Sequence, residues 1–226
     1  MAEPGAIMTP HTGLSDGRNP VREAQFGAGM GATAPSRWNP RARGALRAVI
    51  RADRAANDAA GTSGLLKPGV QALIVYRFGQ WALARRRRGL LAGLAEKLYW
   101  ALFASVRNST GIELVATATV GRNPRIEHQS GIVVHPFAVI GDDVQIHHGV
   151  TIGALRNQSE LADIKTNPPR VGARVVFGVG SIVLSGVTIG DDARIGPNAV
   201  VAKDVPRGAT VVAMPSRTLQ LGRHDD

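Results

Sequence analysis

The sequence predicts an α+β protein in which an N-terminal helical region precedes a parallel β-helix, and two periodic patterns support this prediction. Beyond residue 111, aliphatic residues recur at every sixth position, whereas residues 45–107 place apolar residues at helical spacing. A six-residue repeat is typical of a parallel β-helix, in which each coil buries its side chains against the coils above and below. The in-phase positions are Ile140, Ile146 and Ile152, then Val171, Phe177, Val183, Ile189, Ile195 and Val201.

The chain is expected to divide into four segments. These are a disordered tail (1–42), a helical region (43–110), the β-helix (111–217) and a C-terminal tail (218–226). The first segment is rich in Gly, Pro, Ser and Thr and has no apolar face, so residues 1–40 should be dispensable for folding. Two breaks interrupt the repeat: a slip of two residues between Ile126 and Val134, and an insertion at 155–169, which should form an external loop.

The composition excludes several kinds of site and indicates where in the cell the protein is expected. The absence of cysteine excludes disulfides, thiolate zinc sites and a cysteine nucleophile. The formal charge of +10 belongs to the N-terminal part, because residues 1–100 carry 15 Lys/Arg against 6 Asp/Glu. Without a long apolar run or a signal sequence, a cytoplasmic protein is expected, with no nucleic-acid partner. The basic run at 84–89 is either a solvated helix end or a patch for an anionic membrane or polymer at the inner face of the membrane.

Four of the six histidines lie close together in sequence: His128, His135, His147 and His148. Because side chains alternate along a strand, His147 and His148 should point to opposite faces, so at most one shares the face of His128. The alternatives for this pair are a zinc site of three histidines or a contribution to a neighbouring subunit's site. His135 is expected at a surface or a corner.

The segment GIELVATATVGRNPRIEHQSGIVV, the later coils and the closing KDVP and PSR segments resemble the serine acetyltransferase family. The resemblance covers about residues 111–217 and implies a left-handed β-helix built of hexapeptide repeats. The GIE segment and the short helical region also resemble polysaccharide O-acetyltransferases of the colanic-acid type. Together these resemblances imply an acetyl-CoA-dependent O-acetyltransferase, a homotrimer with sites between subunits, and no metal.

The resemblance assigns the catalytic pair to His128 and Glu113. A hydroxyl that attacks a thioester must lose its proton as the new bond forms, and an imidazole is suited to accept that proton. Glu113 lies fifteen positions before His128, which is near one coil length, so its carboxylate is expected to orient the ring.

Further residues are expected to bind the cofactor. The resemblance implies that the pantetheine arm of acetyl-CoA lies along the coils, where small residues permit close approach. Cationic side chains are candidates for its anionic end. The small residues are Gly153, Ala154, Gly178 and Gly180, and the cations are Arg194, Lys203 and Arg217.

Residues 167–170 bear on which hydroxyl compound accepts the acetyl group. Where the family has Arg-His-Pro-Lys, with Arg and His contacting the amino-acid acceptor, this chain has Asn167 to Arg170, with the sequence NPPR. An amino-acid carboxylate would lose those partners, and an unpaired charge is costly in a desolvated pocket. The sequence therefore favours a sugar hydroxyl over L-serine. The alternatives are L-serine O-acetylation, a hexapeptide-repeat zinc hydratase and a non-catalytic scaffold.

Overall fold

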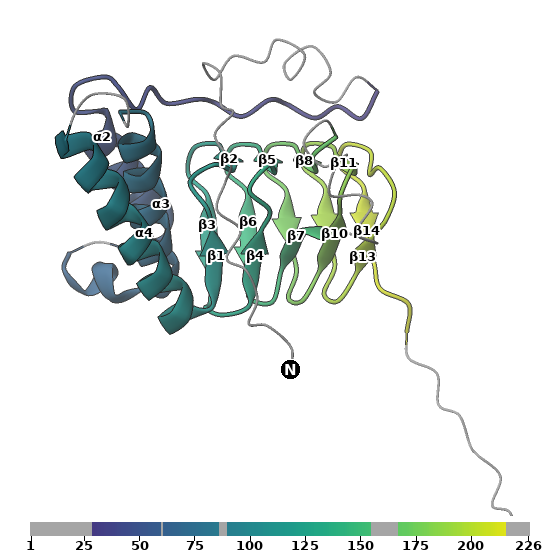
Figure 1. Cartoon of the computed structure of the whole chain (residues 1–226). Coiled ribbons are helices and arrows are strands. Elements are labelled where there is room, and N and C mark those ends of the chain that lie inside the picture. Colours follow the sequence, from purple (N-terminus) through teal and green to yellow (C-terminus); the bar gives the residue numbers. More distant parts are fainter. Residues whose placement is uncertain (1–28, 60, 86–89, 155–166, 216–226) are drawn as a thin grey trace, which may run out of the picture.

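A computed structural model describes residues 29–59, 61–85, 90–154 and 167–215, and it shows a group of helices at one end of a parallel β-helix (Figure 1). The helices are α2 (Ala45–Ala56), α3 (Pro68–Leu83) and α4 (Leu90–Thr110), with the 3-10 turn η1 (Ser63–Leu66) before α3. Both parts of the predicted α+β architecture are confirmed.

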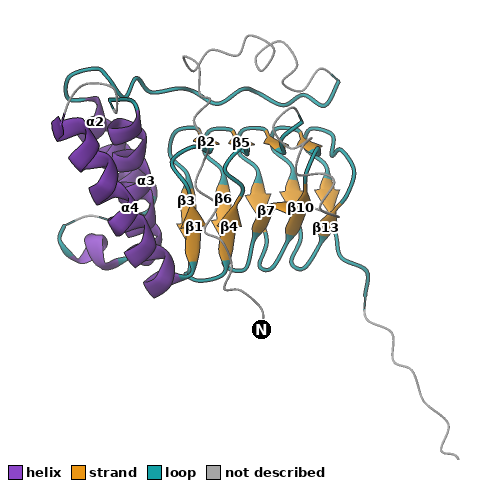
Figure 2. Ribbon diagram, viewed as in Figure 1, coloured by secondary structure: helices purple, strands orange, loops and turns teal. Residues whose placement is uncertain are grey.

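The strands form three parallel sheets, and each complete coil contributes one strand to each sheet (Figure 2). The first sheet holds β1 (Ile112–Leu114), β4 (Ile132–Val134), β7 (Thr151–Ala154), β10 (Ile182–Leu184) and β13 (Val200–Val201). The second holds β2 (Thr119–Val120), β5 (Val139–Ile140), β8 (Arg170–Val171) and β11 (Thr188–Ile189). The third holds β3 (Arg125–Glu127), β6 (Gln145–His147), β9 (Val176–Phe177), β12 (Arg194–Ile195) and β14 (Thr210–Val211).

The six-residue repeat corresponds to the inward-facing row of each sheet. Val171, Phe177 and Val183 are fully buried on three successive strands, one from each sheet. The other in-phase residues are also buried. Each contacts equivalent residues of neighbouring coils, so the interior is a stack of aliphatic layers.

The predicted slip of two residues lies in the corner between the third and first sheets. Arg125 on β3 pairs with Gln145, twenty positions later, whereas Val133 on β4 pairs with Thr151, eighteen positions later. The two extra residues therefore belong to the corner between β3 and β4. This corner is the one that carries His128.

Helix α3 attaches the helical group to the first coil. Gly79 lies so close to helix α4 and to the first coil that a Cβ atom there would be 2.3 Å from Tyr99 of α4 and 2.7 Å from Ala116 of the coil. Arg77, which is fully buried, bonds to Asp53 of α2 at 2.7 Å and donates to the carbonyl oxygens of Val120 and Gly121 at 3.0 and 2.6 Å. One guanidinium thus joins two helices to the β-helix.

Helix α4 packs through an aromatic row and leaves its leucines exposed. Tyr99 and Phe103 lie in the core, and the Tyr99 hydroxyl accepts a hydrogen bond from the N–H of Ala116 at 2.9 Å. The exposed row is Leu91, Leu94, Leu98 and Leu102. Spacing alone does not separate two apolar rows on one helix, and the larger aromatic surface is the one buried. No described helix is long and apolar enough to cross a membrane.

Residues 29–42, assigned to a disordered tail from sequence, run along the β-helix from its last coils to the helices (Figure 1). Thr33 donates from its N–H and its hydroxyl to the buried carboxylate of Asp191. The N–H of Ser36 donates to Asp142 at 2.9 Å. The prediction of disorder is wrong for residues 29–42. They bind the β-helix through backbone groups and through carboxylates at its corners, and composition does not reveal such contacts. Residues 1–28 lie outside the described residues.

Replacing Arg77 by Met should lower the free energy of unfolding by about 3–5 kcal/mol, because it leaves the Asp53 carboxylate buried without its partner. Denaturant unfolding of the single variants and of the double variant Arg77→Met with Asp53→Leu measures this. The double variant should lose less than the sum of the single losses. Strictly additive losses would contradict a direct coupling of the two side chains.

Deleting residues 1–40 should lower the free energy of unfolding by about 2–4 kcal/mol, because it removes the hydrogen bonds that Thr33 and Ser36 donate to Asp191 and Asp142. Deleting residues 1–28 should change it far less. Thr33→Val is the matched point variant, since it removes the hydroxyl donor and keeps the backbone one. Equal thermal unfolding of both truncated proteins would show that residues 29–40 contribute nothing to stability.

Candidate functional site

The lengthened corner places His128 over the next coil. His128 and Ser130 both adopt left-handed backbone conformations, with φ of 62° and 84°. Gly131 ends the corner with a φ of 67°, and Gly149 and Gly180 stack beneath it in the following coils with the same conformation. His128 is exposed. The additional residues therefore form a loop on which the imidazole of His128 is exposed and accessible to a substrate.

His147 and His148 both lie beside His128. The ring centroid of His148 is 5.7 Å from that of His128, in an edge-on arrangement, and that of His147 is 6.5 Å away. The expectation that at most one of the pair shares the face of His128 is wrong. Strand β6 ends at His147, so His148 already belongs to the corner and escapes the alternation of a strand.

The two neighbouring imidazoles have different environments. His147 Nδ1 lies 2.7 Å from the carbonyl oxygen of Phe177 in the next coil. His148 Nδ1 is buried and has no hydrogen-bond partner among the described residues. Glu127 is in register with His147 and is paired with Arg125 at 3.0 Å.

Glu113 lies in the middle of β1 and is half-buried, between the buried residues Ile112 and Leu114. Strand β1 pairs with β4, the strand that begins after the His128 corner, and Glu113 is opposite Val133. Within the described part of the chain, Glu113 and His128 share no hydrogen bond or ion pair. The orienting role of Glu113 stays a prediction.

Two of the four small residues predicted to bind the cofactor lie on the same edge as the histidines. Gly178 and Gly180 follow β9, at the corner below His147 and His148. A Cβ at Gly178 would be 2.7 Å from the backbone nitrogen of Pro197, and Gly180 has a φ of 67°. Coil stacking therefore accounts for both glycines, independently of a ligand.

Gly153 and Ala154 lie at a different edge, where β7 ends. A Cβ at Gly153 would be 2.5 Å from that of His135, so packing against this histidine accounts for Gly153. The ring of His135 is half-buried, its Nδ1 accepts a hydrogen bond from the N–H of Phe137 at 3.3 Å, and burial lowers its pKa. His135 is thus a corner residue, as expected from sequence.

The predicted cations are dispersed. Arg194 is exposed on β12 of the third sheet, and Lys203 is exposed in the turn after β13. Arg217 lies outside the described residues, as do residues 155–166 of the predicted loop. At the end of that loop, Asn167 accepts a hydrogen bond from the buried Arg170 at 3.0 Å.

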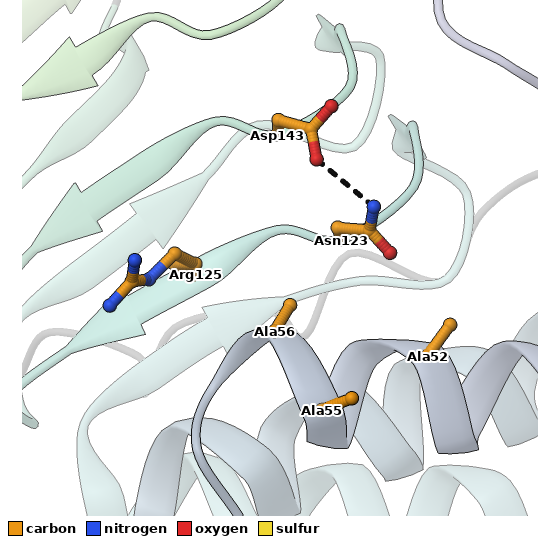
Figure 3. A pocket seen from close by; sticks show the side chains of 6 residues that line it. All are labelled: Ala52, Ala55, Ala56, Asn123, Arg125 and Asp143. Atoms are coloured by element: carbon orange, nitrogen blue, oxygen red, sulfur yellow. Dashed lines mark hydrogen bonds between the residues drawn. The ribbon is translucent and has the colours of Figure 1, made fainter.

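A hollow elsewhere contains none of these residues. It has a volume of about 430 Å³ and lies where α2 meets the corners after β2 and β5 (Figure 3). The side chains of Ala52, Ala55, Ala56, Asn123, Arg125 and Asp143 line it. Within the described ranges, no three His, Cys, Asp or Glu side chains are arranged to hold a metal ion.

Comparison with known proteins places the chain in a family. Residues 168–203 match the model of the bacterial transferase hexapeptide (six repeats). The chain is 40% identical to a serine acetyltransferase of Helicobacter pylori over 159 residues, which are 70% of this chain and 85% of the relative. It is 38% identical to that of Mycobacterium tuberculosis over 178 residues, 77% of this chain and 72% of the relative. The chain belongs to the serine acetyltransferase family. The predicted acetyltransferase activity is thereby confirmed.

Solved structures agree with this assignment. The Neisseria gonorrhoeae serine acetyltransferase in complex with serine matches with a TM-score of 0.60 at 25% identity, over 76% of this chain and 68% of the other. A serine acetyltransferase in complex with CoA matches with a TM-score of 0.57 at 27% identity, over 76% and 67%. The native serine acetyltransferase 1 of Entamoeba histolytica matches with a TM-score of 0.59 at 28% identity, over 74% of this chain and 63% of the other.

Proposed function

We propose that this protein is an acetyl-CoA-dependent L-serine O-acetyltransferase. The observation that carries the proposal is the resemblance to serine acetyltransferases at up to 40% identity across most of the chain. The sequence favoured a sugar hydroxyl because Asn167 and Pro168 replace the family's Arg and His. The relatives reported above are serine acetyltransferases, so L-serine is the better-supported substrate, and other residues must bind its carboxylate.

His128 is the proposed general base. The serine hydroxyl oxygen attacks the carbonyl carbon of the thioester while a His128 ring nitrogen takes the hydroxyl proton. The C–S bond then breaks, and the CoA thiolate leaves with that proton as the free thiol. Support comes from the exposed position of His128 on a lengthened corner. Glu113, on the strand beside β4, is proposed to stabilise the imidazolium that forms.

The proposed path of acetyl-CoA follows the edge that carries His128. Below the histidines this edge continues as Gly178 and Gly180, which place no side chain on it. Arg194 on the adjoining sheet is a candidate for the anionic end of the cofactor. Gly153, Ala154 and Lys203 lie at the other edge of the first sheet and could reach the same cofactor only from a second copy. The predicted trimer would supply such a copy.

Peripheral contact with an anionic surface is proposed only on the sequence and the surface of the helices. The exposed leucine row of α4 (Leu91, Leu94, Leu98 and Leu102) and the basic residues of the N-terminal part carry this proposal. Amphipathic helices of this kind bind membranes through apolar area and positive charge together. Acetyl transfer does not require the contact.

The acceptor is tested by measuring acetyl-CoA consumption against L-serine and a panel of sugars and oligosaccharides. L-serine should saturate with a Michaelis constant at or below the millimolar range of ordinary enzymes. The sugars should give no saturable rate. A sugar that saturates with a higher kcat/KM than L-serine would overturn the proposed acceptor.

Replacing His128 by Ala should lower kcat by roughly two to four orders of magnitude, the usual contribution of a general base. Glu113→Gln should lower it less, because the amide keeps the shape and loses only the charge. Gln129→Ala, next to His128 in the same corner, is the matched control. A near-normal rate for the His128 variant, with unchanged thermal unfolding, would remove His128 from the mechanism.

A further inference from the structure

The two histidines beside His128 present complementary hydrogen-bonding groups. A carbonyl oxygen only accepts, so the 2.7 Å contact with Phe177 requires the proton of His147 to be on Nδ1. The Nε2 atom of neutral His147 then carries a lone pair and accepts a hydrogen bond. The backbone of the third coil thereby sets the tautomer of a ring in the second coil.

The surroundings of His148 favour the opposite tautomer. Its Nδ1 is buried without a partner among the described residues. A buried donor left unpaired is rarer than an under-satisfied acceptor, so Nδ1 carries the lone pair and Nε2 carries the proton. Neutral His148 therefore offers an N–H donor. The pair presents one acceptor and one donor next to the proposed base.

The spacing of the rings fits one small polar molecule. The centroids of His147 and His148 lie 6.5 and 5.7 Å from that of His128. A hydrogen-bonded oxygen or nitrogen lies about 2.8 Å from each atom it joins, so the polar groups of a three-carbon molecule can contact the three rings together. The neighbouring carboxylate, Glu127, is paired with Arg125.

We propose that His147 and His148 bind the amino-acid part of the acceptor while His128 receives its hydroxyl proton. His148 Nε2–H donates to the acceptor's carboxylate, and His147 Nε2 accepts from its ammonium group. This assigns the partners that an amino-acid acceptor needs in a chain where Asn167 and Pro168 replace the family's cationic pair. The inference rests on the proposed function, which it deepens by naming the residues that recognise the substrate class.

Variants paired with truncated acceptors test each contact against a substrate that lacks its partner. The acceptors are L-serine, ethanolamine without the carboxylate, and 3-hydroxypropanoate without the ammonium group. His148→Phe keeps a ring against His128 but has no N–H, and His148→Gln restores a donor near Nε2. His147→Asn keeps a donor to the Phe177 carbonyl and removes Nε2.

His148→Phe should lower kcat/KM about 10- to 100-fold for L-serine, the range of a hydrogen bond to a charged group, and leave ethanolamine unchanged. His148→Gln should recover most of the loss. His147→Asn should lower kcat/KM for L-serine and leave 3-hydroxypropanoate unchanged. Losses equal for all three acceptors, or no loss, would overturn the inference and indicate a purely structural pair.

Imidazole ¹⁵N resonances of the full-length wild-type protein provide a test that does not need turnover. When both rings are neutral, these resonances should show a protonated Nδ1 for His147 and a protonated Nε2 for His148. L-serine should shift both rings, and ethanolamine should leave His148 Nε2 unshifted. The reversed tautomers, or no response to L-serine, would overturn the inference. Responding rings in a protein that does not acetylate serine would instead refute the proposed function.

Discussion

The buried ion pair of Arg77 and Asp53 is the interaction on which the arrangement of this protein depends. Burial raises the pKa of the Asp53 carboxyl, and the hydrogen bonds and charge of Arg77 oppose that rise. Two ions removed from water are stable only when hydrogen bonds satisfy them further, and here Val120 and Gly121 accept from the guanidinium. Those carbonyls belong to the first coil, so the helices bind the exposed end of the β-helix through backbone groups that would otherwise lack a partner.

The stacked coils that this end cap protects also position the site. Apart from the coil that contains the insertion at 155–169, the coils have nearly the same length, so residues at one corner lie above one another, and left-handed glycines at Gly131, Gly149 and Gly180 keep the edge continuous. The two extra residues before Gly131 depart from this regularity. They place His128 outside the regular row of corner residues and beside the two histidines of the next coil. An irregularity of the repeat therefore creates the site.

The sequence predicted the β-helix well because each inward residue recurs at a fixed interval and its burial depends only on equivalent neighbours. It also located the slip at the His128 corner. It predicted less about the N-terminal part. Residues 29–42 bind through Asp142 and Asp191, and the helix α4 buries Tyr99 rather than its leucines. Both outcomes depend on which surfaces of the folded chain contact each other, and the spacing of residues within one segment does not predict those contacts.

By itself, the sequence determined the period, the corner lengths, the fold class and the family, because these follow from local spacing and from motifs. Only the tertiary structure decided that His147 and His148 both lie beside His128, since stacking one coil on another joins residues twenty positions apart. It also decided which nitrogen of His147 carries the proton, through the carbonyl of Phe177. A hydrogen bond between coils depends on their register, which is a property of the folded chain and not of any single segment.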